Sequence, residues 1–240
     1  MSDNDDPMTP ATHPTVDAAT DATRVDAAAR VSQPPVGLLY RSFRRTTDVV
    51  VSFVGLVCSL PLFLVVAAII ATSSRGPVFF SQERVGLDGK RFLVVKFRTM
   101  RQGTDREVLT DPAAYEAYVA NGYKLGEDDP RITRIGRWLR KTSLDELPQL
   151  VNVLAGQMSV VGVRPLVPDE FAARAPSDRA LYVRLRPGLT GLWQIAGRSS
   201  LTPANRIELD REYLRAPSIR HDLAILCKTP AALSRTQEAH

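Results

Sequence analysis

The chain has 240 residues, 44% of them hydrophobic and 24% charged, a length that suits one catalytic domain with additional segments. Its formal net charge of +5 is unevenly spread, because residues 1–36 carry −4 and residues 37–240 carry +9. Such a basic body indicates an anionic partner: phosphates, nucleic acid or an acidic membrane surface. Two cysteines, Cys58 and Cys227, exclude a disulfide scaffold and favour a reducing compartment. Three scattered histidines, without CxxC or HExxH motifs, argue against a histidine-built metal site.

Residues 1–36 form the first segment, which is rich in Asp, Ala, Thr and Pro and contains no aromatic residue. A segment of this composition buries too little apolar area to offset its ordering entropy, so we predict a disordered tail. Its acidic N-terminus, with no apolar core directly after it, is not typical of a secretory signal.

An uncharged apolar run follows at residues 49–71, VVVSFVGLVCSLPLFLVVAAIIA. A helix of about 20 such residues spans a bilayer core of about 30 Å, so a single-pass anchor is one interpretation. Pro61 lies near the middle of the run, where it removes a helix hydrogen bond and clashes with the preceding turn. Each arm then reaches only about halfway across the bilayer, and Ser59 could bind a backbone carbonyl freed by the kink.

The charges that flank this run bear on its topology. Basic residues stand on both sides of it: Arg41, Arg44 and Arg45 before, Arg75, Arg84, Lys90 and Arg91 after. The positive-inside rule places both flanks on the cytoplasmic side. We therefore predict a re-entrant helix hairpin within residues 37–75, which enters the membrane, bends at Pro61 and returns.

A basic body of residues 76–235 begins with two short predicted strands, around Phe79-Phe80 and over residues 92–97. The sequence GLDG at 86–89 predicts the turn between them. Strand alternation puts Lys96 and Arg98 on one face, which is compatible with a solvated face or with a binding surface.

Further along, a short helical piece is predicted around residues 115–120. A basic amphipathic helix around residues 131–141, apolar at Ile132, Ile135 and Leu139, is typical of a membrane-surface helix.

The adjacent acids Asp145 and Glu146 admit two interpretations. In SLDE at 143–146, Ser143 and Glu146 fit a helix capping box, and an apolar run follows. Alternatively, Arg140 and Lys141 upstream and Arg164 downstream suit phosphate binding. Carboxylates would repel phosphate unless one holds a divalent metal or attacks phosphorus, and aspartate does form aspartyl phosphates.

The stretch RLRPGLTGLWQIAGRSS at 184–200 contains three glycines and a proline, which predict an irregular loop. Trp193 within it is compatible with a core position or an interfacial anchor. Arg186 and Arg198 are compatible with structural roles or with contacts to an anionic substrate.

These motifs occur in a single order over residues 40–235: the apolar run, GPVFFSQERVG, KFRTM, DPRITRIGRWLRKTSLDELPQL, MSVVGVRP and RPGLTGLWQIAGR. Together they resemble the bacterial sugar transferase family, the monotopic polyprenyl-phosphate hexose-1-phosphate transferases. The resemblance implies an α-rich α/β protein. Its parts are a re-entrant helix hairpin, amphipathic interfacial helices and a small cytosolic catalytic domain. It also implies transfer of a sugar 1-phosphate from a UDP-sugar to undecaprenyl phosphate, with release of UMP.

The same resemblance implies roles for individual residues. Asp145 would be the covalent nucleophile and Glu146 its partner, both near Mg²⁺ or Mn²⁺. Lys96, Arg140 and Arg164 match the family's phosphate-facing cations, and Pro61 matches its helix-breaking proline. The implied location is the bacterial cytoplasmic membrane, with the catalytic domain on the cytosolic face and in contact with membrane lipids.

Two other functions compete with this one. The basic body alone would suit a membrane-tethered nucleic-acid-binding protein, but it lacks an interleaved aromatic platform and known docking motifs, so we expect no nucleic-acid partner. A signalling or scaffold protein without chemistry would tolerate loss of both dyad carboxylates. The sequence leaves open which sugar is transferred and whether the protein forms a homo-oligomer.

Overall fold

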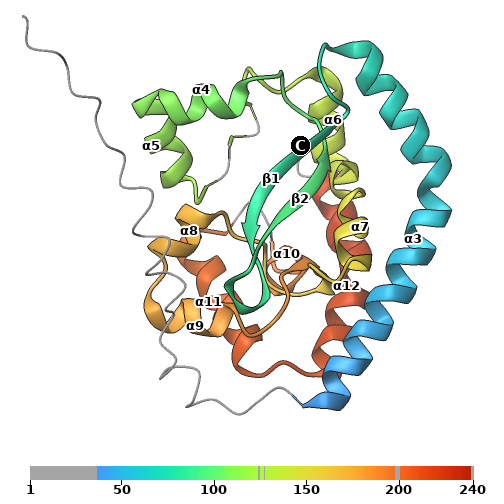
Figure 1. Cartoon of the computed structure of the whole chain (residues 1–240), viewed down its shortest axis with the longest axis vertical. Helices are drawn as coiled ribbons and strands as arrows, with labels where there is room; N and C mark the ends of the chain where they lie inside the picture. The colour runs from blue at the N-terminus through green and yellow to red at the C-terminus, as the bar shows by residue number, and fades with distance from the viewer. Residues whose placement is uncertain (1–36, 124, 127, 198–200, 239–240) are drawn as a thin grey trace, which may run out of the picture.

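A computed structural model describes residues 37–123, 125–126, 128–197 and 201–238 (Figure 1). The tail predicted at residues 1–36 lies outside the described residues. The fold is rich in helices and contains two small sheets of two strands each. This agrees with the predicted α-rich α/β class.

Helix α3, Leu38–Ser73, is the long apolar element, and among the described residues it alone is long and apolar enough to cross a membrane. It curves along one side of the body (Figure 1) and remains one continuous helix through Pro61. The predicted hairpin of two separate arms is therefore not confirmed. Ser59 Oγ donates a long hydrogen bond of 3.5 Å to the Leu56 carbonyl oxygen. This carbonyl is one residue before that of Val57, which receives no helix hydrogen bond because Pro61 has no N–H.

The first half of α3 is fixed to the body by a buried polar stripe: Tyr40, Arg44, Asp48 and Ser52, four residues apart. Spacing of four places them on one helix face. Arg44 donates to the Val161 carbonyl oxygen and lies 3.6 Å from the Asp222 carboxylate. The Asp48 carboxylate accepts hydrogen bonds from Ser159 Oγ at 2.8 Å and from the Val160 amide at 2.7 Å.

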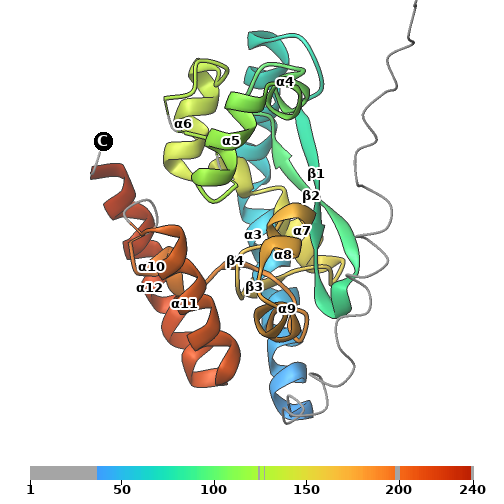
Figure 2. The same ribbon diagram turned by 90° about the vertical axis from the view of Figure 1, so that its left-hand side faces the viewer.

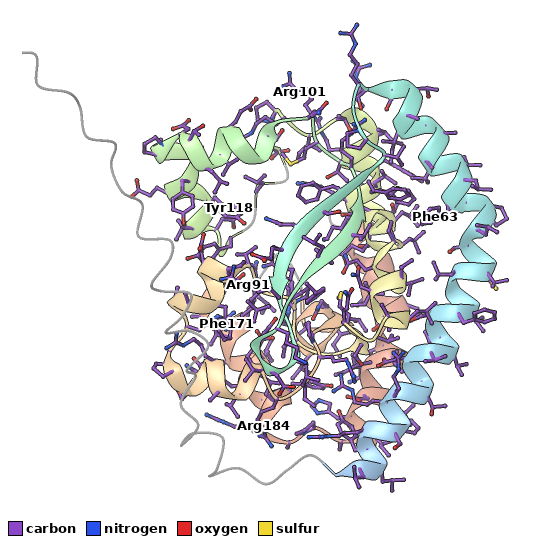
Figure 3. The ribbon with its side chains drawn as sticks, viewed as in Figure 1. Phe63, Arg91, Arg101, Tyr118, Phe171 and Arg184 are labelled. Atoms are coloured by element: carbon purple, nitrogen blue, oxygen red, sulfur yellow. The ribbon has the colours of Figure 1, made fainter. Side chains whose placement is uncertain are left out.

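The second half of α3 packs on the same body through apolar contacts. Val66 and Ile70 are buried in a cluster with Phe97 and Leu139. Phe63 lies on the side of α3 turned toward the body (Figure 3), with its ring centroid 4.7 Å from that of Phe97. Both halves of this helix therefore contact one body. On its outer side many apolar side chains remain exposed, among them Val50, Phe53, Val54, Val57, Leu60, Leu64 and Val65.

The predicted β-hairpin that follows α3 is confirmed. Strand β1, Phe79–Val85, pairs antiparallel with β2, Arg91–Phe97, and a 3₁₀ turn at Leu87–Gly89 joins them. Asp88 adopts the left-handed conformation, φ 59°, which aspartate tolerates better than most residues. Pairing of Phe80 with Lys96 and of Arg84 with Phe92 places these four side chains on one face of the hairpin.

Strands β3, Ser159–Val161, and β4, Gly188–Thr190, form a parallel pair in the centre of the core. The stretch around Gly188 is thus a strand rather than the irregular loop that its glycines predict. The pairing requires very close backbones, since a Cβ on Gly188 would meet the Gly162 nitrogen at 2.1 Å. Around this pair the core gathers Val85, Val94, Met158, Leu166, Tyr182 and Ile225.

The remaining helices surround the core (Figure 2). They are α4, Thr104–Thr110; α5, Pro112–Ala120; α6, Arg134–Thr142; α7, Gln149–Leu154; α8, Pro168–Ala173; α9, Pro176–Tyr182; α10, Leu192–Ile195; α11, Pro203–Arg215; and α12, Ile219–Glu238. The predicted helical piece at 115–120 falls in α5, and the predicted basic amphipathic helix is α6. Within α6, Leu139 is buried in the core whereas Trp138 is 47% exposed.

Candidate active site

The dyad lies on a 3₁₀ turn, Leu144–Glu146, between α6 and α7. The predicted capping box does not form, because Ser143 adopts the left-handed conformation, φ 58°, and makes no side-chain cap hydrogen bond. Helix α7 begins only after Pro148. The turn that carries the two carboxylates is therefore separate from the start of α7.

Glu146 forms an ion pair with Lys96, with 2.7 Å between Oε1 and Nζ. Lys96 comes from the end of β2, about 50 residues earlier in the chain, so the hairpin delivers a cation to the dyad. Both side chains keep partial solvent access, 26% for Lys96 and 35% for Glu146. Arg98 takes a different position: its guanidinium donates to the carbonyl oxygens of Ser74 and Arg75 just after α3.

Asp145 is the buried member of the dyad, only 8% exposed. Burial raises the pKa of its carboxyl to about 6 and the adjacent Glu146 charge adds to that shift, while Lys96 and Arg140 oppose it. Arg140, in the last turn of α6, donates from Nε to Thr99 Oγ1 at 3.0 Å. Asp145, Glu146, Lys96 and Arg140 thus form one cluster of interacting charges.

Arg164 belongs to a second cluster. It follows β3, and its guanidinium lies 3.4 Å from the Gly122 carbonyl oxygen, 3.5 Å from that of Tyr123 and 3.9 Å from Glu170. It lines a cavity of about 170 Å³ together with Glu170, Arg174, Trp193 and Arg206. The partners of Arg164 therefore come from just after the end of α5 and from α8.

The donor set of the dyad can be compared with the needs of a divalent metal. Within the described residues no group of three or more His, Cys, Asp or Glu side chains could hold a metal ion. Two adjacent carboxylates fit Mg²⁺ or Mn²⁺ when substrate phosphates complete the shell, because Mg²⁺ commonly binds through one or two carboxylates. Asp145 and Glu146 meet this requirement.

Three features of this region were not predicted. Gln149, 2% exposed, has a side-chain amide nitrogen without a hydrogen-bond partner among the described residues. Trp193 is 6% exposed and faces the cavity beside Arg164, and Arg206 stacks over its ring at 5.4 Å. The sequence contains the motifs around these residues, but no pattern in it predicts that Arg206 contacts Trp193. Of the other basic residues considered, Arg186 donates to the Gly156 carbonyl oxygen, and Arg198 lies outside the described residues.

Comparison with known proteins gives a family match and several similar relatives. The family model described as bacterial sugar transferase matches residues 39–236. Exopolysaccharide production protein ExoY of Rhizobium meliloti is 45% identical over 206 residues, covering 84% of this chain and 88% of the relative. ExoY of Sinorhizobium fredii is 43% identical, with coverage of 84% and 88%. Undecaprenyl-phosphate galactose phosphotransferase of Salmonella typhimurium is 40% identical over 83% of this chain, which spans 42% of that longer protein.

The family match covers most of the chain. The dyad, its two nearby cations and the long apolar helix all fall inside the matched residues. The chain therefore belongs to the bacterial sugar transferase family, of the polyprenyl-phosphate hexose-1-phosphate transferase type.

Proposed function

We propose that the protein transfers a sugar 1-phosphate from a UDP-sugar to undecaprenyl phosphate and releases UMP. This reaction would initiate synthesis of a bacterial surface polysaccharide or glycoconjugate at the membrane. Family membership makes the protein a sugar-phosphate transferase. The observation that carries the proposal is the buried Asp145 carboxylate beside Glu146, with Lys96 and Arg140 as the neighbouring cations.

The proposed chemistry proceeds in two displacements at one phosphorus. A carboxylate oxygen of Asp145 attacks the phosphorus that bears the sugar. The bond from that phosphorus to the bridging oxygen breaks, and UMP leaves with the electron pair. A phosphate oxygen of undecaprenyl phosphate then attacks the aspartyl phosphosugar, and the Asp145 carboxylate is released. The product is a polyprenyl-diphosphate-linked sugar, and the enzyme returns to its starting state.

The surrounding side chains have distinct tasks in this scheme. Lys96 and Arg140 compensate the negative charge of the phosphate oxygens as the nucleophile approaches. Their charges also favour the ionised form of Asp145, which burial disfavours. Glu146 holds Lys96 in place through the 2.7 Å ion pair. When Mg²⁺ or Mn²⁺ is bound at the dyad, it supplies charge neutralisation for the diphosphate.

The topology belongs to the same proposal. Both halves of α3 pack on one body, through Asp48 in the first half and Ile70 in the second. A straight span would separate the two halves by a bilayer, whereas a basic, hydrogen-bonded body cannot occupy the hydrocarbon core. In this proposal the exposed outer side of α3 lies in the cytosolic leaflet of the inner membrane, and the catalytic domain stays on the cytosolic face. In that position a soluble UDP-sugar and a lipid phosphate both reach the dyad.

Mass spectrometry of the intact protein tests the covalent step. The purified protein is incubated with Mg²⁺ and one UDP-sugar at a time, without lipid. We expect a mass increase of one hexose phosphate, UMP in equal amount, and peptide mapping of the adduct to Asp145. The matched control, Asp145→Asn, retains the shape and should form no adduct. UMP release by the wild-type protein without any adduct, or an adduct on another residue, would contradict the proposal.

A further inference from the structure

The cavity that contains Arg164 has features that the reaction at the dyad does not use. Its walls come from the end of α5, the loop after β3, and helices α8, α10 and α11. Three arginines and two acids line it: Arg164, Arg174, Arg206, Glu170 and Asp210. Between these charges lie Trp193, Tyr123 and the apolar side chains of Leu166 and Ile207. Cations, aromatic rings and apolar walls around one cavity are the usual composition of a site for an organic anion.

The polar groups of this cavity are incompletely paired. Arg206 Nε and Glu170 Oε2 are buried without hydrogen-bond partners among the described residues. Arg164 Nη1 lies 3.9 Å from that Glu170 oxygen, beyond hydrogen-bond distance. Burial lowers the pKa of Arg206, and the neighbouring Arg164 lowers it further. A bound molecule with both an anionic group and an N–H donor would satisfy these atoms.

The hairpin connects this cavity with the dyad. Lys96, which pairs with Glu146, and Arg84 lie on the same face of the hairpin, at opposite ends. Burial lowers the pKa of Arg84 to about 10, and the positive charge of Arg164 at the cavity lowers it further. Arg84 lies four residues along β1 from Phe80, the partner of Lys96. At about 3.3 Å per residue, Phe80 and Arg84 are roughly 13 Å apart along this strand.

Aromatic side chains border the same route. Tyr118 of α5 lies beside the hairpin (Figure 3), and its ring meets that of Tyr123 edge to face at 5.6 Å. Tyr123 and the preceding Gly122 both adopt left-handed conformations, φ 56° and 67°. This conformation is costly for tyrosine and turns the chain so that Tyr123 lines the cavity.

We infer that this cavity binds the nucleoside phosphate part of the UDP-sugar, an inference that rests on the proposed function. Trp193 and Tyr123 contact the uracil ring, and Glu170 Oε2 accepts a hydrogen bond from its N–H. Arg164 and Arg206 bind the phosphate nearer the nucleoside. The sugar-bearing phosphate then extends along the hairpin toward Asp145. Arg206 and Trp193 are thus binding residues that determine recognition of the nucleotide, whereas Asp145 performs the chemistry.

Tryptophan fluorescence tests this inference directly, because the chain has two tryptophans and Trp138 lies elsewhere, exposed on α6. In a Trp138→Phe protein, Trp193 is the sole reporter. We expect UMP to change its fluorescence saturably and ribose 5-phosphate to bind much more weakly, since it lacks the base. Arg206→Met in this background should weaken UMP binding about tenfold or more, the loss of one charge-assisted hydrogen bond. The matched control is Arg215→Met, an exposed arginine on the same helix, which should leave UMP affinity unchanged.

Two further measurements separate the possible failures. Arg206→Lys preserves the charge without the forked donor, so it should weaken UMP binding even if Arg206→Met does not fold. Adduct formation at Asp145 should need a correspondingly higher UDP-sugar concentration in the Arg206 variants. A Trp193 signal that responds to a lipid phosphate but not to UMP would overturn the inference, as would unchanged UMP affinity in folded Arg206 variants. UMP binding at Trp193 without any adduct in the wild-type protein would instead overturn the proposed covalent step alone.

Discussion

At the scale of single residues, Asp145, which we propose as the nucleophile, has to meet two opposed requirements. A nucleophile needs a charged carboxylate, whereas burial favours the neutral carboxyl and raises its pKa to about 6. Lys96 and Arg140 reduce this cost without removing it. A nucleophile held this way is destabilising for the fold and available for attack, which is a common compromise at active sites.

The Asp145→Asn variant should reveal this compromise in its stability. Because the folded-state pKa lies above the ordinary value of 3.8, the folded protein binds more protons than the unfolded chain between about pH 4 and 6. Asp145 therefore lowers the wild-type free energy of unfolding as pH rises through this window. The variant lacks this effect, so its stability relative to the wild type should increase by on the order of 1 kcal/mol from pH 4 to pH 7.

Thermal melts in detergent at several pH values check this prediction. The wild-type protein, melted in parallel at each pH, is the reference for this comparison. A difference between Asp145→Asn and the wild type that stays constant from pH 4 to 7, or that decreases, would contradict the account of Asp145.

At the scale of elements, α3 serves as both membrane segment and structural helix. Its apolar composition predicts only the first use. The second depends on the stripe of Tyr40, Arg44, Asp48 and Ser52, which binds the helix to β3 and α12. The positive-inside rule counts Arg44 among the charges that set the membrane topology, whereas its guanidinium donates to the Val161 carbonyl oxygen in the core. Arg45 likewise donates to the carbonyl oxygens of Val153 and Leu154 at the end of α7.

Asp48→Ala should therefore destabilise the protein. It removes the acceptor of two hydrogen bonds and leaves the buried Ser159 hydroxyl and Val160 amide unpaired. Each unsatisfied group costs about 1–3 kcal/mol, so we expect a clear decrease in melting temperature. Thr46→Ala, two residues away on an exposed position of the same helix, should have little effect. Equal melting temperatures for both variants would show that the stripe does not fix α3.

At the scale of the whole molecule, the decisive relation is between the two halves of α3 and the single body that both contact. Tyr40 donates to Asp222 of α12 at 2.9 Å, and Val66 is buried with Phe97 of the hairpin. One body cannot lie on both sides of a bilayer. The exposed apolar residues of α3 therefore mark the part of the molecule that enters the lipid.

Cysteine accessibility tests this topology. In a protein whose Cys58 and Cys227 are replaced by serine, single cysteines are introduced at Ser42 and Ser73, exposed positions near the two ends of α3. In intact cells a membrane-impermeant thiol reagent should label neither site, because we propose that both lie on the cytosolic side. After permeabilisation both should react, which serves as the control. Labelling of Ser42→Cys alone in intact cells would establish a single-pass anchor.

Several features followed from the sequence because they depend on local chemistry. An uncharged run of 23 residues specifies a helix for lipid, and GLDG between two alternating segments specifies a hairpin. Asp145 and Glu146 stood out because adjacent acids among cations suit phosphate chemistry. The order of the motifs over residues 40–235 likewise indicated the family.

Other features were decided only by the tertiary structure, because they join residues far apart in the chain. No local pattern predicts the parallel pairing of β3 with β4, which depends on the close approach of Gly162 and Gly188. Nor does the sequence reveal that Ser143 is left-handed and that Glu146 binds Lys96 instead of capping a helix. Charge and residue type are properties of the sequence, whereas which charges meet depends on how the fold closes the long loops between them.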